Sequence, residues 1–227
     1  MIESNPKLEA ARKAMEWVNS GQIIGLGTGS TANFFIEELG NKIKHDNLKV
    51  TVTSSSFSST LLARKLNIPI STFESIGNID LYVDGADEVD PEKNLIKGRG
   101  ASMVQEKILA ASSDVFLVIV DSSKLVNKLG AKARVPVEVL PCARIPASRS
   151  LASMGGEPEL RMAVKKDGPV ITDQGNFILD VKFSPDAGLP SLDTAINNIP
   201  GVLGHGIFTN LATKIIVGEK TGTRVIE

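Results

Sequence analysis

Short apolar runs that alternate with helix-like segments constrain the fold of this 227-residue chain more than any other feature of its sequence. The run Val115–Val120 is apolar throughout, which is typical of a strand buried on both faces of a parallel sheet. Helices between such strands cover the two faces of the sheet. We therefore predict an α/β fold with a doubly wound, mostly parallel, Rossmann-like sheet. Strands are expected at Gln22–Leu26, Lys49–Thr53, Ile79–Asp84 and Val115–Val120, and helices at Pro6–Asn19, Thr31–Lys42, Phe57–Leu66 and Ser102–Ala111.

The order of elements changes after about Gly130 and predicts a second, smaller domain. The pattern there is strand, helix, strand, strand, helix, strand, which is typical of a ferredoxin-like α+β domain. These elements are expected at Pro136–Leu140, Arg144–Met154, Glu159–Val164, Phe177–Phe183, Leu189–Asn198 and Val202–Phe208, with a hairpin turn at Asp173–Asn176. The tail Lys214–Val217 reads as a strand that rejoins the first sheet. We predict a catalytic domain of residues 1–129 with 209–227, and a smaller domain of residues 130–208.

Composition excludes several classes of protein. The net charge of −1 provides no basic field for nucleic acid or an anionic membrane, so an anionic ligand would need a local binding cluster. One cysteine, Cys142, rules out an internal disulfide and suits a reducing compartment. With only His45 and His205 besides that cysteine, a zinc or iron site of imidazole and thiolate ligands is not expected. The sequence shows no signal-peptide core or membrane-length apolar run, so we expect a cytoplasmic protein without a metal or cofactor.

The loop Gly25–Thr31 (GLGTGST) follows the first predicted strand and invites comparison with the dinucleotide-binding fingerprint. The comparison fails, because Ser30 occupies the place of the third glycine and serines 54–56 stand where an acidic residue is needed. What remains is a glycine-rich loop whose N–H groups and hydroxyls open a helix, which suits a phosphate or sugar oxygen. A simple strand-to-helix turn capped by Thr31 stays open as the alternative.

The loop Asp84–Asp90 (DGADEVD) places four carboxylates directly after another predicted strand. Ligands bind at the C-terminal ends of parallel strands, and crowding there can separate carboxyl pKa values so that one group exchanges protons with a sugar hydroxyl. The spacing does not fit a calcium-binding loop. A magnesium site and a solvated acidic turn remain alternatives.

The segment Lys97–Ser102 (KGRGAS) also follows a strand and opens a helix. Glu106 lies about one helical turn after Ser102 and is placed to lean toward a bound ligand. A further polar loop, Asp121–Lys124, follows the next strand. A surface lysine and an exposed helical glutamate are the ordinary alternatives for Lys97 and Glu106.

Together these loops resemble those of type A ribose-5-phosphate isomerases. The resemblance rests on GLGTGST at 25–31, the serines at 54–56, DGADE at 84–88, KGRGA at 97–101, Glu106-Lys107 and the DSSK segment at 121–124. It continues through Pro136–Pro141 and Ile199–Val202 and runs from Lys7 nearly to the C-terminus in the same order. Arg99 departs from the family loop, where a glycine is commonest, and Ser102 replaces an alanine.

The resemblance implies a metal-free aldose–ketose isomerase that interconverts ribose 5-phosphate and ribulose 5-phosphate in the pentose phosphate pathway. It implies that Glu106 is the general base and acid. In such a reaction Lys97, or loop N–H groups near it, would stabilise the developing oxyanion, and Asp84 or Asp87 would exchange protons with hydroxyls during ring opening. Substrate contacts are implied for Lys7, Thr28, Gly29, Ser30, Thr31, Asp84, Gly85, Ala86, Asp87, Lys97, Gly98, Arg99, Gly100 and Lys124. The family suggests a homodimer or homotetramer, with no nucleic acid or membrane partner.

Two other function classes share parts of this pattern. A CoA transferase of related architecture would use Glu106 as a nucleophile and would form a covalent thioester. A sugar-phosphate sensor would carry a DNA-binding module, but the stretch before Gln22 is too short for a helix-turn-helix unit. The co-occurrence of all the polar loops favours the isomerase.

Overall fold

A computed structural model describes residues 5–227, and these residues form two compact units. Unit 1 contains the residues up to 86 together with 105–124 and 211–227, and unit 2 contains 87–104 and 125–210. The predicted domain boundaries divide the chain at other positions and stay a prediction. Within residues 5–227, no helix has both the length and the apolar character needed to cross a membrane.

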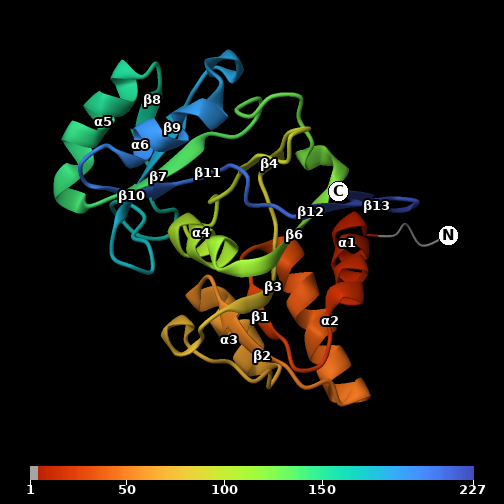
Figure 1. Ribbon diagram of the computed structural model, residues 1–227. Helices are drawn as coiled ribbons and strands as arrows, with labels where there is room; N and C mark the ends of the chain where they lie inside the picture. The colour runs from red at the N-terminus through yellow and green to blue at the C-terminus, as the bar shows by residue number, and fades with distance from the viewer. Residues whose placement is uncertain (1–4) are drawn as a thin grey trace. The chain divides into compact units, whose positions relative to one another are not determined.

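Unit 1 is built on a six-stranded sheet in the order β13-β12-β6-β3-β1-β2 (Figure 1). Neighbouring strands are parallel except for the β12–β13 pair, which is antiparallel. The strands are β1 (Ile23–Leu26), β2 (Thr51–Ser54), β3 (Ile79–Asp84), β6 (Ser113–Asp121), β12 (Lys214–Glu219) and β13 (Gly222–Ile226). The mostly parallel sheet is confirmed, and the C-terminal tail rejoins it as predicted. The edge strand β13 was not predicted.

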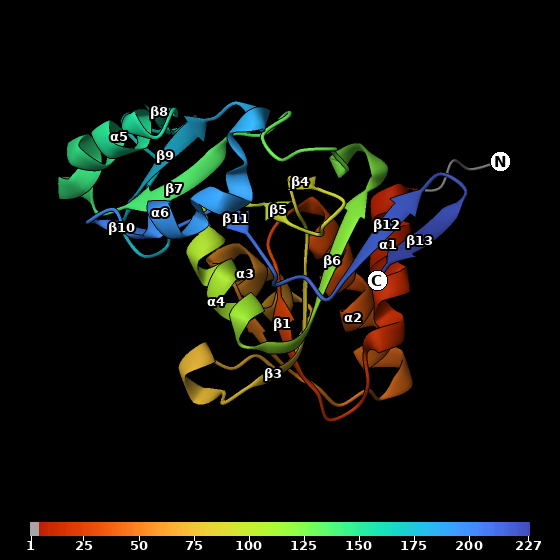
Figure 2. The same ribbon diagram turned by 45° about the horizontal axis from the view of Figure 1, so that its top comes forward.

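Four helices belong to this sheet: α1 (Pro6–Ala14), α2 (Ser30–Asp46), α3 (Phe57–Lys65) and α4 (Met103–Ala111). The Asn5 side chain caps α1 by accepting a hydrogen bond from the Lys7 N–H, and Pro6 occupies the first helical position, where its missing N–H costs nothing. Helices α1 and α2 lie on one side of the sheet, and α4 lies on the other (Figure 2). The sheet is therefore covered on both faces.

The alternation of side chains along β3 decides which residues face which helices. Leu81 and Val83 belong to the apolar core that α1 and α2 cover. Tyr82 points to the opposite face, where its ring stacks on Phe116 of β6 with a centroid separation of 4.7 Å. The α4 face of the sheet thus carries the chain's one tyrosine, completely buried.

Unit 2 contains a four-stranded antiparallel sheet in the order β10-β7-β9-β8. Its elements follow one another as β7 (Val135–Val139), α5 (Arg144–Ser153), β8 (Glu157–Leu160), β9 (Phe177–Lys182), α6 (Asp193–Asn197) and β10 (Val202–His205). Its core joins valines of β7 to residues of both helices, such as Leu151 and Ile196. The predicted ferredoxin-like order is confirmed.

Three details of unit 2 differ from the prediction. The predicted strand Val202–Phe208 is two strands, because β10 ends before Gly206 and β11 (Ile207–Phe208) pairs with β5 (Leu95–Ile96) in another sheet. That sheet has three strands, including β4 (Glu88–Val89), each too short to show a period. The predicted helix over 189–198 begins as the 3₁₀ turn Leu189–Leu192, and β8 ends at Leu160 rather than at Val164.

Candidate active site

The β1–α2 loop of unit 1 is shaped by the carboxylate of Asp84. Asp84 is fully buried, and its Oδ1 accepts hydrogen bonds from the N–H groups of Thr28 (3.0 Å) and Gly85 (2.7 Å). A β-carbon on Gly27 would lie 2.1 Å from this carboxyl group, so only glycine fits there. Gly29 has φ 113°, a conformation that side chains rarely adopt. Gly27 thus lets the Asp84 carboxylate approach the backbone closely, and Gly29 lets the chain turn into α2.

The serine-rich loop after β2 forms hydrogen bonds with the β1–α2 loop. The Thr28 hydroxyl lies 2.9 Å from the Ser55 hydroxyl and donates to that of Ser56 at 2.8 Å. Ser55 and Ser59 donate in turn to the carbonyl oxygens of Leu26 (3.1 Å) and Gly27 (2.6 Å). The buried serines therefore fix the loop by satisfying its carbonyl groups.

Tyr82 connects Asp84 with Glu106 of α4. The Tyr82 hydroxyl donates a hydrogen bond to Asp84 Oδ2. Burial raises the pKa of Tyr82 well above its usual value, and the negative charges of Asp84 and Glu106 raise it further. Glu106 is only 3% exposed. The sequence prediction that Glu106 leans inward is consistent with this burial, and two carboxylates lie within electrostatic reach of one neutral phenol.

A second cluster in unit 1 carries cationic groups. Lys7, in the first turn of α1, donates from Nζ to the Ser30 hydroxyl at 3.0 Å. Burial alone would raise the pKa of Asp121, but hydrogen bonds from Ser123 and the charges of Lys124 and Lys7 lower it below its usual value. Two lysines and a helix N-terminus therefore meet around one carboxylate, which leaves a net positive charge suited to an anion.

Gly218 of β12 allows the start of α1 to pack closely beside this cluster. Its Cα pairs with Asp121 in the sheet register, and a β-carbon there would lie 1.7 Å from the carbonyl oxygen of Pro6. The close approach places Lys7 next to the C-terminal end of β6.

Unit 2 holds the predicted loop Lys97–Gly100. Lys97 is 2% exposed, and its ammonium group lies 5.6 Å from the centre of the Phe208 ring. Asp87 Oδ2 accepts a hydrogen bond from the Arg99 N–H at 3.1 Å. The Arg99 side chain is 83% exposed, and its Nε lies 4.0 Å from Asp87 Oδ1. Lys97 is therefore not an ordinary surface lysine, whereas Arg99 points largely to solvent.

The four carboxylates of DGADEVD do not form one acidic turn. Glu88 is fully buried and accepts hydrogen bonds from the N–H groups of Gly130, Lys132 and Ala133. Asp90 accepts from the Asn94 N–H and side-chain amide. These two residues hold loops of unit 2 together. Among residues 5–227, no group of three or more His, Cys, Asp or Glu side chains is placed to hold a metal ion.

Comparison with known proteins agrees with this geometry. The family described as ribose 5-phosphate isomerase A (phosphoriboisomerase A) matches residues 51–222, most of the chain. The ribose-5-phosphate isomerase A of Thermosynechococcus vestitus is 53% identical, over 94% of this chain and 91% of that protein. The chain belongs to the ribose 5-phosphate isomerase A family. Neither the CoA-transferase alternative nor the sensor alternative is favoured by these relatives.

Solved structures of ribose 5-phosphate isomerases have the same fold. The enzyme from Methanocaldococcus jannaschii is 45% identical with a TM-score of 0.94, and 98% of each chain is covered. A D-ribose-5-phosphate isomerase in complex with phospho-erythronic acid is 43% identical with a TM-score of 0.96 over 100% of both chains. The predicted α/β fold class is thereby confirmed.

Several residues around these loops were not singled out in the sequence as parts of an isomerase site. Tyr82 and Phe208 are ordinary apolar-strand residues by pattern, and only the structure shows their contacts with Asp84 and Lys97. Arg161 was also missed, because the predicted strand Glu159–Val164 ran through it and only the structure shows that β8 ends at Leu160.

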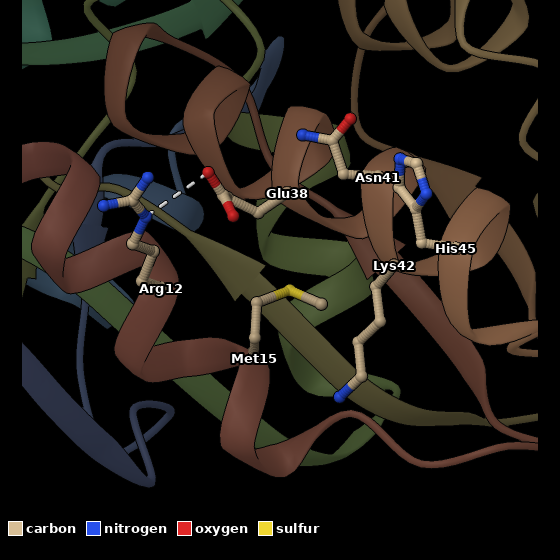
Figure 3. A pocket seen from close by; sticks show the side chains of 6 residues that line it. All are labelled: Arg12, Met15, Glu38, Asn41, Lys42 and His45. Atoms are coloured by element: carbon tan, nitrogen blue, oxygen red, sulfur yellow. Dashed lines mark ion pairs between the residues drawn. The ribbon is translucent and has the colours of Figure 1, made fainter.

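A separate hollow of about 320 Å³ lies between α1 and α2 of unit 1 (Figure 3). Arg12 and Glu38 form an ion pair across it, with 3.4 Å between Nε and Oε1. Lys42 and His45 belong to the last turns of α2, so this part of the hollow lies toward the edge of the sheet opposite to the β1–α2 loop. It contains none of the residues predicted to act in the isomerase reaction.

Proposed function

We propose that the chain catalyses the interconversion of D-ribose 5-phosphate and D-ribulose 5-phosphate, with Glu106 moving the proton between C2 and C1. The observation that carries the proposal is the burial of Glu106 within electrostatic reach of Tyr82, the residue that also donates to Asp84, in a chain of this family. A carboxylate removed from bulk water is a suitable base for a carbon acid, because a desolvated carboxylate is more basic than a hydrated one.

The reaction needs three kinds of group. Glu106 removes the C2 proton of the open-chain aldose and returns it to C1, while the hydroxyl proton on O2 passes to O1, so that the ketose forms and the carboxylate is unchanged after one turnover. The negative charge that develops on the carbonyl oxygen is stabilised by Lys97 and by N–H groups of its loop. Asp84 or Asp87 exchanges protons with the sugar hydroxyls during ring opening.

The phosphate end of the substrate is assigned to the cationic cluster of unit 1. Lys7 and Lys124 provide the charge, and the N-terminus of α2 provides N–H groups. Binding energy at this end positions the reacting carbons. The proposed contacts of the whole substrate are those predicted from the sequence: Lys7, Thr28, Gly29, Ser30, Thr31, Asp84, Gly85, Ala86, Asp87, Lys97, Gly98, Arg99, Gly100 and Lys124.

Substitution of Glu106 by Gln tests the proposal. The variant should retain substrate binding while kcat falls about 10²–10⁴-fold, the range for loss of acid–base catalysis. Glu37→Gln, which changes an exposed glutamate of α2, is the matched control and should behave as the wild type. Incorporation of solvent deuterium at the reacting carbons should be lost together with turnover. Near-normal turnover of Glu106→Gln would remove Glu106 from the mechanism.

The location, the oligomeric state and the pathway of the enzyme are proposed from its family. We infer a cytoplasmic homodimer or homotetramer of the non-oxidative pentose phosphate pathway, as the family resemblance suggests. Light scattering of the purified protein measures the oligomeric state. Because proton transfer by a carboxylate needs no Lewis acid, activity should survive dialysis against EDTA, and restoration of lost activity by added Mg²⁺ would contradict the metal-free mechanism.

A further inference from the structure

One partly buried arginine of unit 2 binds the proposed substrate loop to the four-stranded sheet. Arg161 follows β8 directly, and its side chain is 16% exposed. Its Nε and Nη2 donate to the two carboxylate oxygens of Asp180 on β9 at 2.7 and 2.5 Å. Its Nη1 donates to the carbonyl oxygens of Gly98 (3.1 Å) and Arg99 (3.0 Å). One guanidinium therefore makes four hydrogen bonds, two of which end on the loop.

The loop needs such an anchor because part of its backbone has an unfavourable conformation. Gly98 has φ 102°, and Ala101 has φ 63°, in the left-handed region that disfavours a residue with a β-carbon. A β-carbon on Gly98 would lie 2.8 Å from both Met103 Cβ and Pro136 Cγ. Surrounding contacts must hold this conformation, and the bonds from Arg161 are two of them.

The same bonds also orient the peptide groups of the loop. In a trans peptide the C=O of one residue and the N–H of the next point in opposite directions. Carbonyls of Gly98 and Arg99 that face Arg161 therefore turn the N–H groups of Arg99 and Gly100 the other way. The Arg99 N–H obeys this rule, since it donates to Asp87 Oδ2. By the same rule the Gly100 N–H is directed away from Arg161.

We propose that Arg161 is a positioning residue of the isomerase: it fixes the Lys97–Gly100 loop so that the Lys97 ammonium and the Gly100 N–H are pre-oriented for the substrate carbonyl oxygen, while the Arg99 N–H keeps Asp87 in place. This inference rests on the proposed function for the assignment of that loop to substrate binding. Arginine is required rather than lysine, because only the planar guanidinium fork reaches a carboxylate and two carbonyls at once.

The experiment compares Arg161→Gln and Arg161→Lys with Arg134→Gln. Arg134 directly precedes β7 and pairs with Glu159 of β8 at 2.6 Å, but its side chain is 44% exposed and this ion pair does not involve the loop, so it is the control. Both Arg161 variants should lose about tenfold to a hundredfold in kcat, the scale of a small misplacement of a catalytic group. KM should change less than about threefold, because the phosphate contacts are assigned to unit 1. Arg134→Gln should keep kcat within about twofold.

A cycle with Lys97→Met separates the inference from the proposed function. If Arg161 acts through the loop, the double variant Arg161→Gln/Lys97→Met should be no more than about threefold worse than Lys97→Met alone. Full recovery of kcat by Arg161→Lys, or multiplication of the two single effects in the double variant, would overturn the positioning role. The positioning role would also be overturned if folded Arg161→Gln had wild-type kcat while Lys97→Met had a reduced kcat. If Lys97→Met is itself fully active, the loop assignment in the proposed function is wrong.

Discussion

The link between Tyr82 and Asp84 gives a prediction with a calculable size. Tyr82→Phe removes one hydroxyl and leaves the ring in place, so the stacking on Phe116 should persist. The change deletes the hydrogen bond to Asp84 Oδ2, while Oδ1 keeps its N–H donors from Thr28 and Gly85. The carboxylate therefore stays partly satisfied but becomes less rigid.

A hydrogen bond to a charged group contributes about 1.5–3 kcal/mol. Because Asp84 keeps its other donors, we expect a loss near the lower end, about 1.5 kcal/mol. For a chain of this size that corresponds to a decrease in Tm of about 3–6 °C. We expect kcat to fall as well, since Asp84 is proposed to touch the substrate.

The raised pKa of Tyr82 adds a pH dependence. The folded state keeps the phenol protonated at a pH where the unfolded chain ionises it, so the folded state binds more protons. The stabilisation is fully present below the unfolded value of about 10 and is lost as pH rises from there through the folded pKa. The slope of unfolding free energy against pH in this alkaline range should therefore be less negative in Tyr82→Phe than in the wild type.

The assay is direct because the chain has one tyrosine. Tyrosinate absorbance during alkaline titration should stay flat while the protein is folded and should rise only when circular dichroism reports unfolding. Urea unfolding of both proteins between neutral and alkaline pH gives the slopes. A reversible tyrosinate signal near the ordinary pKa in the folded enzyme, or identical slopes for wild type and variant, would refute the reasoning.

Three further substitutions test other contacts. Gly27→Ala places a β-carbon 2.1 Å from the Asp84 carboxyl group, so we expect at least about 1–3 kcal/mol of destabilisation in urea unfolding together with a reduced kcat; a fully stable and active variant would contradict the close packing. Gly218→Ala pushes against the Pro6 carbonyl and so displaces Lys7, and steady-state kinetics should show a raised KM with a smaller change in kcat. The pKa of Asp121 is depressed, so its stabilisation is present above the unfolded value of about 3.9 and is lost as pH falls through the folded pKa. Acid unfolding of Asp121→Asn should therefore show a shallower loss of stability below about pH 4 than the wild type.

Much of the fold could be predicted because long buried strands leave a strong signal. Ile79–Asp84 was predicted at its observed bounds, and, apart from β13, the strand–helix order of the two larger sheets followed from period and length. The polar loops were recognisable because they follow strands at the C-terminal edge of a parallel sheet. The spacing of Glu106 after the loop left both an inward and an exposed position open, and only the structure shows that this side chain is buried.

Other contacts could not be read from the sequence, because they join residues far apart in the chain without a local pattern. Arg161 reaches Gly98 and Arg99 across more than sixty positions. The strands β4, β5 and β11 have two residues each, which is less than one alternation of side chains. Nothing in such a segment distinguishes a strand from a loop until its partner is known.

The carboxylates of DGADEVD show why a cluster in sequence is not a cluster in space. Asp84 ends β3 and turns into the fold, where backbone N–H groups and Tyr82 fix it. Glu88, four residues later on β4, is held by three N–H groups of residues 130–133 and is left with a structural role. Asp84 also accepts three hydrogen bonds, so the number of bonds does not separate the two carboxylates; their donors differ, because those on Glu88 all come from residues 130–133, whereas those on Asp84 come from Thr28, Gly85 and Tyr82. The chemistry proposed for this segment stays with Asp84 and Asp87, as the family resemblance implies, and Glu88→Gln should lower Tm far more than it changes the kcat of the protein that remains folded.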